Sequence, residues 1–128
     1  MIECIVVGAG GFIGAVCRYL IGMIPLKEGC VFPIKTLMIN ITGCFIIGIV
    51  TALAMRSNSL NPRYILFLKV GVCGGFTTYS TFALDTMDLI KGGKIHLAVI
   101  YTVLSVILGV LAVFAGQLVI NSDRLSCL

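Results

Sequence analysis

Four apolar segments, each long enough to cross a lipid bilayer, constrain the fold of this 128-residue chain more than any other feature. A transmembrane helix needs about 20 apolar residues to cover the hydrocarbon core. Such runs occupy approximately residues 2–24, 33–55, 64–90 and 95–120. Because the backbone must satisfy its own hydrogen bonds in lipid, we predict helices rather than strands. The expected fold is a single all-α membrane domain that covers residues 1–128.

The composition excludes most soluble classes of protein. Hydrophobic residues make up 59% of the chain and charged residues 11%, against about 25% charged in a typical soluble domain. The net charge is +4, but the basic residues are scattered, so we do not expect nucleic acid to be a partner. We expect the lipid bilayer to be the partner, because the chain is so apolar. The six cysteines match no zinc pattern and are expected to be reduced, passive packing residues. Glu3 and a long apolar run argue against a cleaved signal peptide.

The basic residues show no bias between the two sides of the membrane, although such a bias normally sets orientation. Four lie on the side that holds both termini: Arg56, Arg63, Lys69 and Arg124. Four lie on the other side: Lys27, Lys35, Lys91 and Lys94. Such a chain can insert both ways, and two opposed copies can then form an antiparallel dimer. The alternative is one orientation, set by a weak bias.

The first span carries a glycine-rich stretch, residues 8–14, that resembles a dinucleotide-binding fingerprint. Ile13 occupies the place of the last glycine, while Glu28 lies where a ribose-binding acid would be expected. A nucleotide-binding enzyme is disfavoured because the chain cannot also supply a doubly wound sheet. We interpret Gly10 and Gly14 as a G-x-x-x-G face that another helix approaches closely, which also favours assembly of the dimer.

Several polar residues inside the spans are candidates for a transport path. Arg18 lies one turn beyond Gly14 and is expected to line an aqueous mouth, or else to snorkel to the interface. Asn40 is the only side-chain amide deep in a span, and it either binds a permeating anion or hydrogen-bonds a neighbouring helix. Two polar stripes run along the spans, one of which includes Asn40. Each stripe either lines a pore or packs against another helix. They are Thr36, Asn40 and Gly43 in the second span, and Tyr101, Ser105 and Gly109 in the fourth.

The third span contains the densest polar sequence, residues 74–82, which reads Gly-Gly-Phe-Thr-Thr-Tyr-Ser-Thr-Phe. Adjacent glycines followed by many hydroxyl groups predict a broken helix. Carbonyl groups that a break releases can hold a cation or line a cavity. A kinked helix whose hydroxyls bond its own carbonyls is the alternative. Asp85 and Asp88 come late in this span, so no carboxylate is expected near the midplane, and no catalytic set is found.

Three motifs together resemble the Fluc (CrcB) family of fluoride channels. They are residues 10–19, 36–43 and 74–82, and they occur in the family's order and spacing. The resemblance implies a passive fluoride channel in the cell membrane that exports toxic fluoride. It further implies a four-helix subunit with a broken third helix, and a dual-topology antiparallel homodimer with two pores.

The resemblance also implies roles for individual residues. A structural sodium ion, which is not transported, would be held by the backbone carbonyls of Gly74 and Thr77. The fluoride path and its vestibule would be formed by Asn40, Phe82, Tyr79, Ser105, Tyr101, Thr36 and Arg18. Tyr79 replaces the family's usual phenylalanine, and Gly109 replaces the next serine of its polar track.

Two other functions remain possible at this point. A small, four-helix, dual-topology cation or drug transporter would need a carboxylate near the midplane. A structural membrane protein without transport would leave Asn40 and the broken third helix without a purpose.

Overall fold

The computed structural model describes residues 1–25, 31–57 and 60–125, and within these ranges the chain forms helices and no strands. Lys27 and Glu28 lie outside the described residues, as does the side chain of Arg124. Four stretches are long and apolar enough to cross a membrane: Ile2–Met23, Ile34–Arg56, Pro62–Lys91 and Ile95–Ser122. The predicted four-span, all-helical membrane protein is therefore confirmed.

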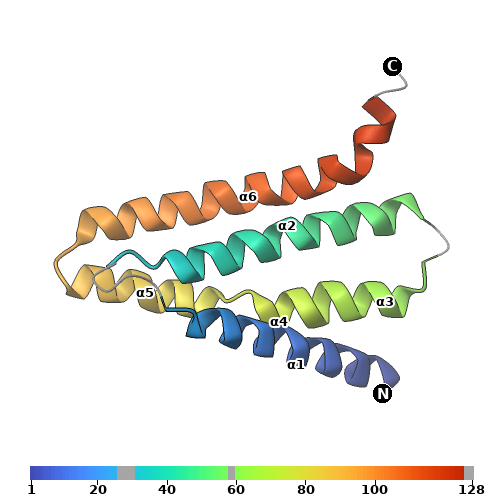
Figure 1. The fold of residues 1–128 in the computed structure, drawn as a ribbon, viewed down its shortest axis with the longest axis horizontal. Helices are drawn as coiled ribbons and strands as arrows, with labels where there is room; N and C mark the ends of the chain where they lie inside the picture. The colour runs from blue at the N-terminus through green and yellow to red at the C-terminus, as the bar shows by residue number, and fades with distance from the viewer. Residues whose placement is uncertain (26–30, 58–59, 126–128) are drawn as a thin grey trace.

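The spans lie side by side, and both chain termini are at the same end of the molecule (Figure 1). Three spans are single helices: α1 (Ile2–Met23), α2 (Ile34–Arg56) and α6 (Ile95–Leu125). The third span is made of four pieces: α3 (Pro62–Leu66), the π-helix η1 (Phe67–Cys73), α4 (Gly74–Phe76) and α5 (Tyr79–Lys91).

The ends of the helices follow from local sequence. Ile24, which precedes a proline, is extended with ψ at 121°, and α1 ends there. The third span begins with Pro62 in its first turn, where the missing N–H costs nothing. Asn61 caps that turn, because its Oδ1 accepts a hydrogen bond from the Arg63 amide at 3.0 Å. Gly93 supplies the left-handed residue, with φ at 71°, in the tight turn before α6.

The four spans pack mainly as two pairs: α2 with α6, and α1 with η1 and α4. Glycine makes the α1 pair possible, since a Cβ on Gly10 would lie 2.9 Å from the Gly71 Cα. A Cβ on Gly14 would lie 2.8 Å from the Phe76 amide nitrogen. The G-x-x-x-G face is thus used within the subunit. It was wrong to count this face in favour of the dimer, because the chain's own third span already occupies it.

The third span is broken as predicted, and the break comes after Phe76. Gly74 is helical, with φ at −65° and ψ at −37°. Thr77 and Thr78 are extended instead, with ψ at 157° and 111°. The glycines therefore precede the break and are not themselves the point where the helix ends. Gly75 serves close packing, because a Cβ there would lie 2.9 Å from the Gly11 Cα.

Candidate functional site

Asn40 of α2 holds the break in the third span through two hydrogen bonds. Its Oδ1 accepts from the Thr78 amide at 2.8 Å, and its Nδ2 donates to the Thr78 carbonyl at 3.2 Å. The side-chain amide thus pairs with a backbone amide as a neighbouring strand would. This is the interhelical bond that the sequence left open as an alternative. A primary amide has two N–H donors, so the second is left for a ligand.

The threonines of the break complete its hydrogen bonding. Thr77 closes the first half, because both its amide and its Oγ1 donate to the Cys73 carbonyl, at 3.0 and 2.9 Å. Thr78 caps α5, since its Oγ1 accepts from the Thr81 amide at 3.1 Å. Its hydroxyl also donates to Thr81 Oγ1 at 2.9 Å. The two threonines therefore end one helix and begin the next.

In this arrangement, two backbone amides donate hydrogen bonds to side chains instead of to the carbonyls predicted to bind sodium. In a continuous helix the Thr78 amide would reach the Gly74 carbonyl, but here it donates to Asn40. The Thr81 amide would likewise reach Thr77, but it donates to the Thr78 hydroxyl. Carbonyl oxygens are hard ligands that suit a hard cation. The carbonyl oxygens of Gly74 and Thr77 therefore have the chemistry that the predicted sodium ion requires. The space beside Gly74 is also open, because a Cβ on this residue would meet no atom within 4 Å.

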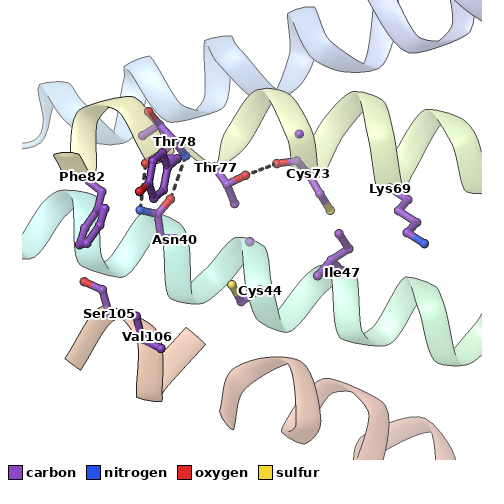
Figure 2. A pocket seen from close by; sticks show the side chains of 13 residues that line it. Asn40, Cys44, Ile47, Lys69, Cys73, Thr77, Thr78, Phe82, Ser105 and Val106 are labelled. Atoms are coloured by element: carbon purple, nitrogen blue, oxygen red, sulfur yellow. Dashed lines mark hydrogen bonds between the residues drawn. The ribbon is translucent and has the colours of Figure 1, made fainter. Parts of the chain in front are cut away.

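A cleft of about 350 Å³ lies between α2, the third span and α6 (Figure 2). It brings together six of the residues predicted from sequence: Asn40, Gly74, Thr77, Tyr79, Phe82 and Ser105. The remaining lining residues are Gly43, Cys44, Ile47, Lys69, Cys73, Thr78 and Val106. Most of the surface that these residues expose to the cleft is apolar, so the cleft offers only a few polar groups to a ligand.

Ser105 is the clearest unused polar group in the cleft. Its Oγ is buried and has no hydrogen-bond partner in the described part of the chain. A buried hydroxyl without a partner costs about 1–3 kcal/mol. Figure 2 shows Ser105 of α6 on the side of the cleft where Phe82 and Asn40 also lie. A ligand in the cleft that accepts a hydrogen bond would satisfy this hydroxyl.

Three aromatic rings continue inward from the break. The Tyr79 and Phe82 ring centroids are 5.7 Å apart, and those of Phe82 and Tyr101 are 5.2 Å apart. Phe32 meets Tyr101 edge to face at 5.6 Å. The rings run from an 82% exposed Tyr79 to a fully buried Tyr101. Phe82 is therefore the ring that joins the cleft to the interior of the bundle.

The other predicted residues, Thr36, Tyr101 and Arg18, do not line the cleft. Thr36 and Asp85 interact with the Tyr101 hydroxyl, the latter at a long 3.5 Å. Arg18 of α1 is half-buried, and its Nε has no partner among the described residues. The structure thus places Thr36 and Tyr101 beyond Phe82 and leaves Arg18 on a different helix.

The roles of Thr78, Cys44 and Lys69 were not predicted from the sequence. A threonine directly before a helix is a typical N-cap, so Thr78 could have been found from its position. Cys44 fills the space beside Gly109, since a Cβ on that glycine would lie 3.5 Å from the sulfur. No local signal indicates this contact, because it joins two distant helices. Lys69 was counted only for topology, but it lines the cleft.

Comparison with known proteins decides the family. The model of the CrcB-like protein family, Camphor Resistance (CrcB), matches residues 5–117. The chain belongs to the CrcB family. Its break, its cleft and the packed glycines of α1 all lie within the region that the CrcB model matches.

Several CrcB relatives match over nearly their whole length. A protein of Rhizobium meliloti is 44% identical over 91% of this chain and 94% of its own. One of Ruminiclostridium cellulolyticum is 44% identical over 92% of each chain, and one of Chlorobium phaeobacteroides is 38% identical over 88% of each. Each of the three is named fluoride-specific ion channel FluC.

Proposed function

We propose that this CrcB-family chain is a passive, fluoride-selective channel that lets toxic fluoride leave the cell. The observation that carries the proposal is the similarity, over nearly the whole chain, to proteins named fluoride-specific ion channels. The cleft supports it, since its free donors suit an anion: one N–H of Asn40 and the unpartnered hydroxyl of Ser105.

The chemistry of the cleft suits conduction rather than tight binding. A conducting site must bind an ion well enough to replace its water but weakly enough to release it. Neutral donors such as Asn40 and Ser105 meet that requirement. The edges of aromatic rings are weakly positive, so Phe82 and Tyr79 offer further weak contacts to an anion. Thr36 and Tyr101 would continue the path beyond Phe82, and Arg18 would lie in a vestibule.

The working unit in this proposal is an antiparallel homodimer of two oppositely inserted copies. The equal count of basic residues on the two sides supports it. C-terminal tags should be labelled from both faces of one membrane, and labelling from one face alone would rule out dual topology. Two or three lysines added to the loops of one side should give one orientation and lower the flux.

A structural sodium ion is the cofactor in this proposal, held by the carbonyl oxygens of Gly74 and Thr77. An ion on the two-fold axis would receive these ligands from both subunits, and its charge would make the dimer centre favourable to anions. Exhaustive replacement of sodium by a large organic cation should lower fluoride flux and the thermal stability of the dimer. Unchanged flux and stability would argue against the ion.

The decisive experiment is fluoride and chloride efflux from liposomes that contain only this protein. We expect fluoride to leave rapidly and chloride to stay. Equal efflux of both anions, or of neither, would overturn the proposal. A dual-topology cation or drug transporter would instead show proton flux driven by its substrate. That alternative is not favoured, because no carboxylate is among the described residues that line the cleft.

A further inference from the structure

The cleft holds one charged side chain, Lys69 of η1, which the proposed function has not used so far. Lys69 lies seven residues after Pro62, the start of the third span, which is about 10 Å along a helix axis. A cation at that position in a membrane span is costly unless it faces water or a partner. Its side chain is exposed, and the described residues include no group that pairs with it.

The position of Lys69 relates it to the polar groups of the cleft. Figure 2 shows it at one end of the cleft, while Asn40, Phe82 and Ser105 gather at the other. Between the two ends the cleft is lined by Ile47, by the thiol side chains of two cysteines, and by Thr77, whose hydroxyl donates to the Cys73 carbonyl. An ion that moved from the Lys69 end to Asn40 would pass a wall that offers it little binding.

The sign of the charge decides which ions this arrangement favours. Among the described residues that line the cleft, Lys69 carries the only full charge. A charge of one sign in a cleft with low-dielectric walls raises the local concentration of oppositely charged ions. At this end of the cleft the concentrated ion would be an anion.

We propose that Lys69 is the entry residue of the anion path, which draws small anions into the cleft from the membrane face where the chain termini lie. This inference rests on the proposed function and adds to it an entrance on one face. Lys69 acts by attraction over a distance and does not hold the ion, because a tight ion pair would slow conduction.

The test is a charge series at position 69, measured as fluoride efflux from liposomes at two ionic strengths. Attraction between exposed charges reaches about 30 Å at 10 mM salt and only about 3 Å at 1 M. At low salt we expect Lys69→Gln to lower the rate about threefold, Lys69→Glu to lower it further, and Lys69→Arg to keep the parent rate. At high salt the differences between the variants should largely disappear.

Arg63→Gln is the matched control. Arg63 belongs to the same span and the same side of the charge count, but it does not line the cleft. Its substitution therefore changes the topological balance as much as Lys69→Gln does. Equal rates for Lys69→Gln and the parent at low salt, or equal losses in both Gln variants, would overturn the inference alone. A parent protein that carries no fluoride would overturn the proposed function and this inference with it.

Discussion

The two halves of the third span contact their neighbours by different means. The half before the break meets α1 through backbone atoms, with Gly10 facing Gly71 and Gly11 facing Gly75. The half after the break, α5, uses side chains: Leu89 packs in a buried cluster with Leu37 of α2 and with residues of α6. Asn40 acts between the two halves, because its side chain hydrogen-bonds the backbone of Thr78 at the break.

The first half therefore contributes to the scaffold of the bundle, and the second half carries candidate groups of the anion site. Where backbones touch, a larger side chain at the point of contact would push the helices apart, so the glycine contacts fix the first half against α1. Where side chains touch, their chemistry can vary while the helices stay in place. The predicted anion groups of the third span, Tyr79 and Phe82, lie on the side-chain half. Substitutions at the glycines that contact α1 should therefore affect folding, and those at the aromatic rings of α5 should affect flux.

The largest effect is expected at Gly14, in the glycine contact. Gly14→Ala would place a Cβ 2.8 Å from the Phe76 amide nitrogen, and backbone cannot move aside as a side chain can. We expect a loss of about 3 kcal/mol, the upper end of the range for overpacking. Gly8→Ala is the matched control, because a Cβ there meets nothing within 4 Å. Thermal unfolding in detergent measures both, and equal stability of the two variants would contradict backbone packing at Gly14.

The next effect is expected at Asn40, between the two halves. Asn40→Asp replaces the donor to the Thr78 carbonyl with an acceptor and places a negative charge on the anion path. Two like charges about 4 Å apart repel each other by about 4 kcal/mol near a protein surface, so fluoride efflux should fall about 100-fold or more. Asn121→Asp, at an exposed position near the end of α6, should leave efflux unchanged. Size-exclusion chromatography establishes that both variants assemble as the parent does. Parent-like efflux in Asn40→Asp would remove Asn40 from the path.

A smaller effect is expected at Phe82, in the side-chain half. Phe82→Ile nearly keeps the volume but removes the ring that meets both Tyr79 and Tyr101. Ring interactions are worth about 0.5–1.5 kcal/mol, so fluoride efflux should fall up to about tenfold in a protein that still folds. Phe114→Ile, at a 57% exposed position on α6, is the control and should conduct as the parent does. Equal efflux in both variants would place the path elsewhere.

The same comparison shows how far the sequence alone could predict this molecule. Hydropathy was sufficient for the four spans, because each one is long and predominantly apolar. Glycine was ambiguous, since Gly74 and Gly75 contributed to the prediction of a broken helix, whereas in the structure Gly75 serves the contact with α1. The break depends instead on Asn40, which is 38 residues from Thr78 and leaves no local pattern. Lys69 shows the same limit, because the sequence does not tell a charge at a membrane end from one in a cleft.

The smallest effect is expected at Tyr79, the outermost ring of the side-chain half. Its ring is 82% exposed in the subunit, and its hydroxyl makes no hydrogen bond within the described residues. Tyr79→Phe keeps the ring that meets Phe82, so fluoride efflux should change by less than about twofold. Tyr64→Phe, at a 68% exposed position outside the cleft, is the matched control. A large loss in Tyr79→Phe alone would mean that the hydroxyl itself binds the ion, and the side-chain half would then contribute a donor as well as ring edges.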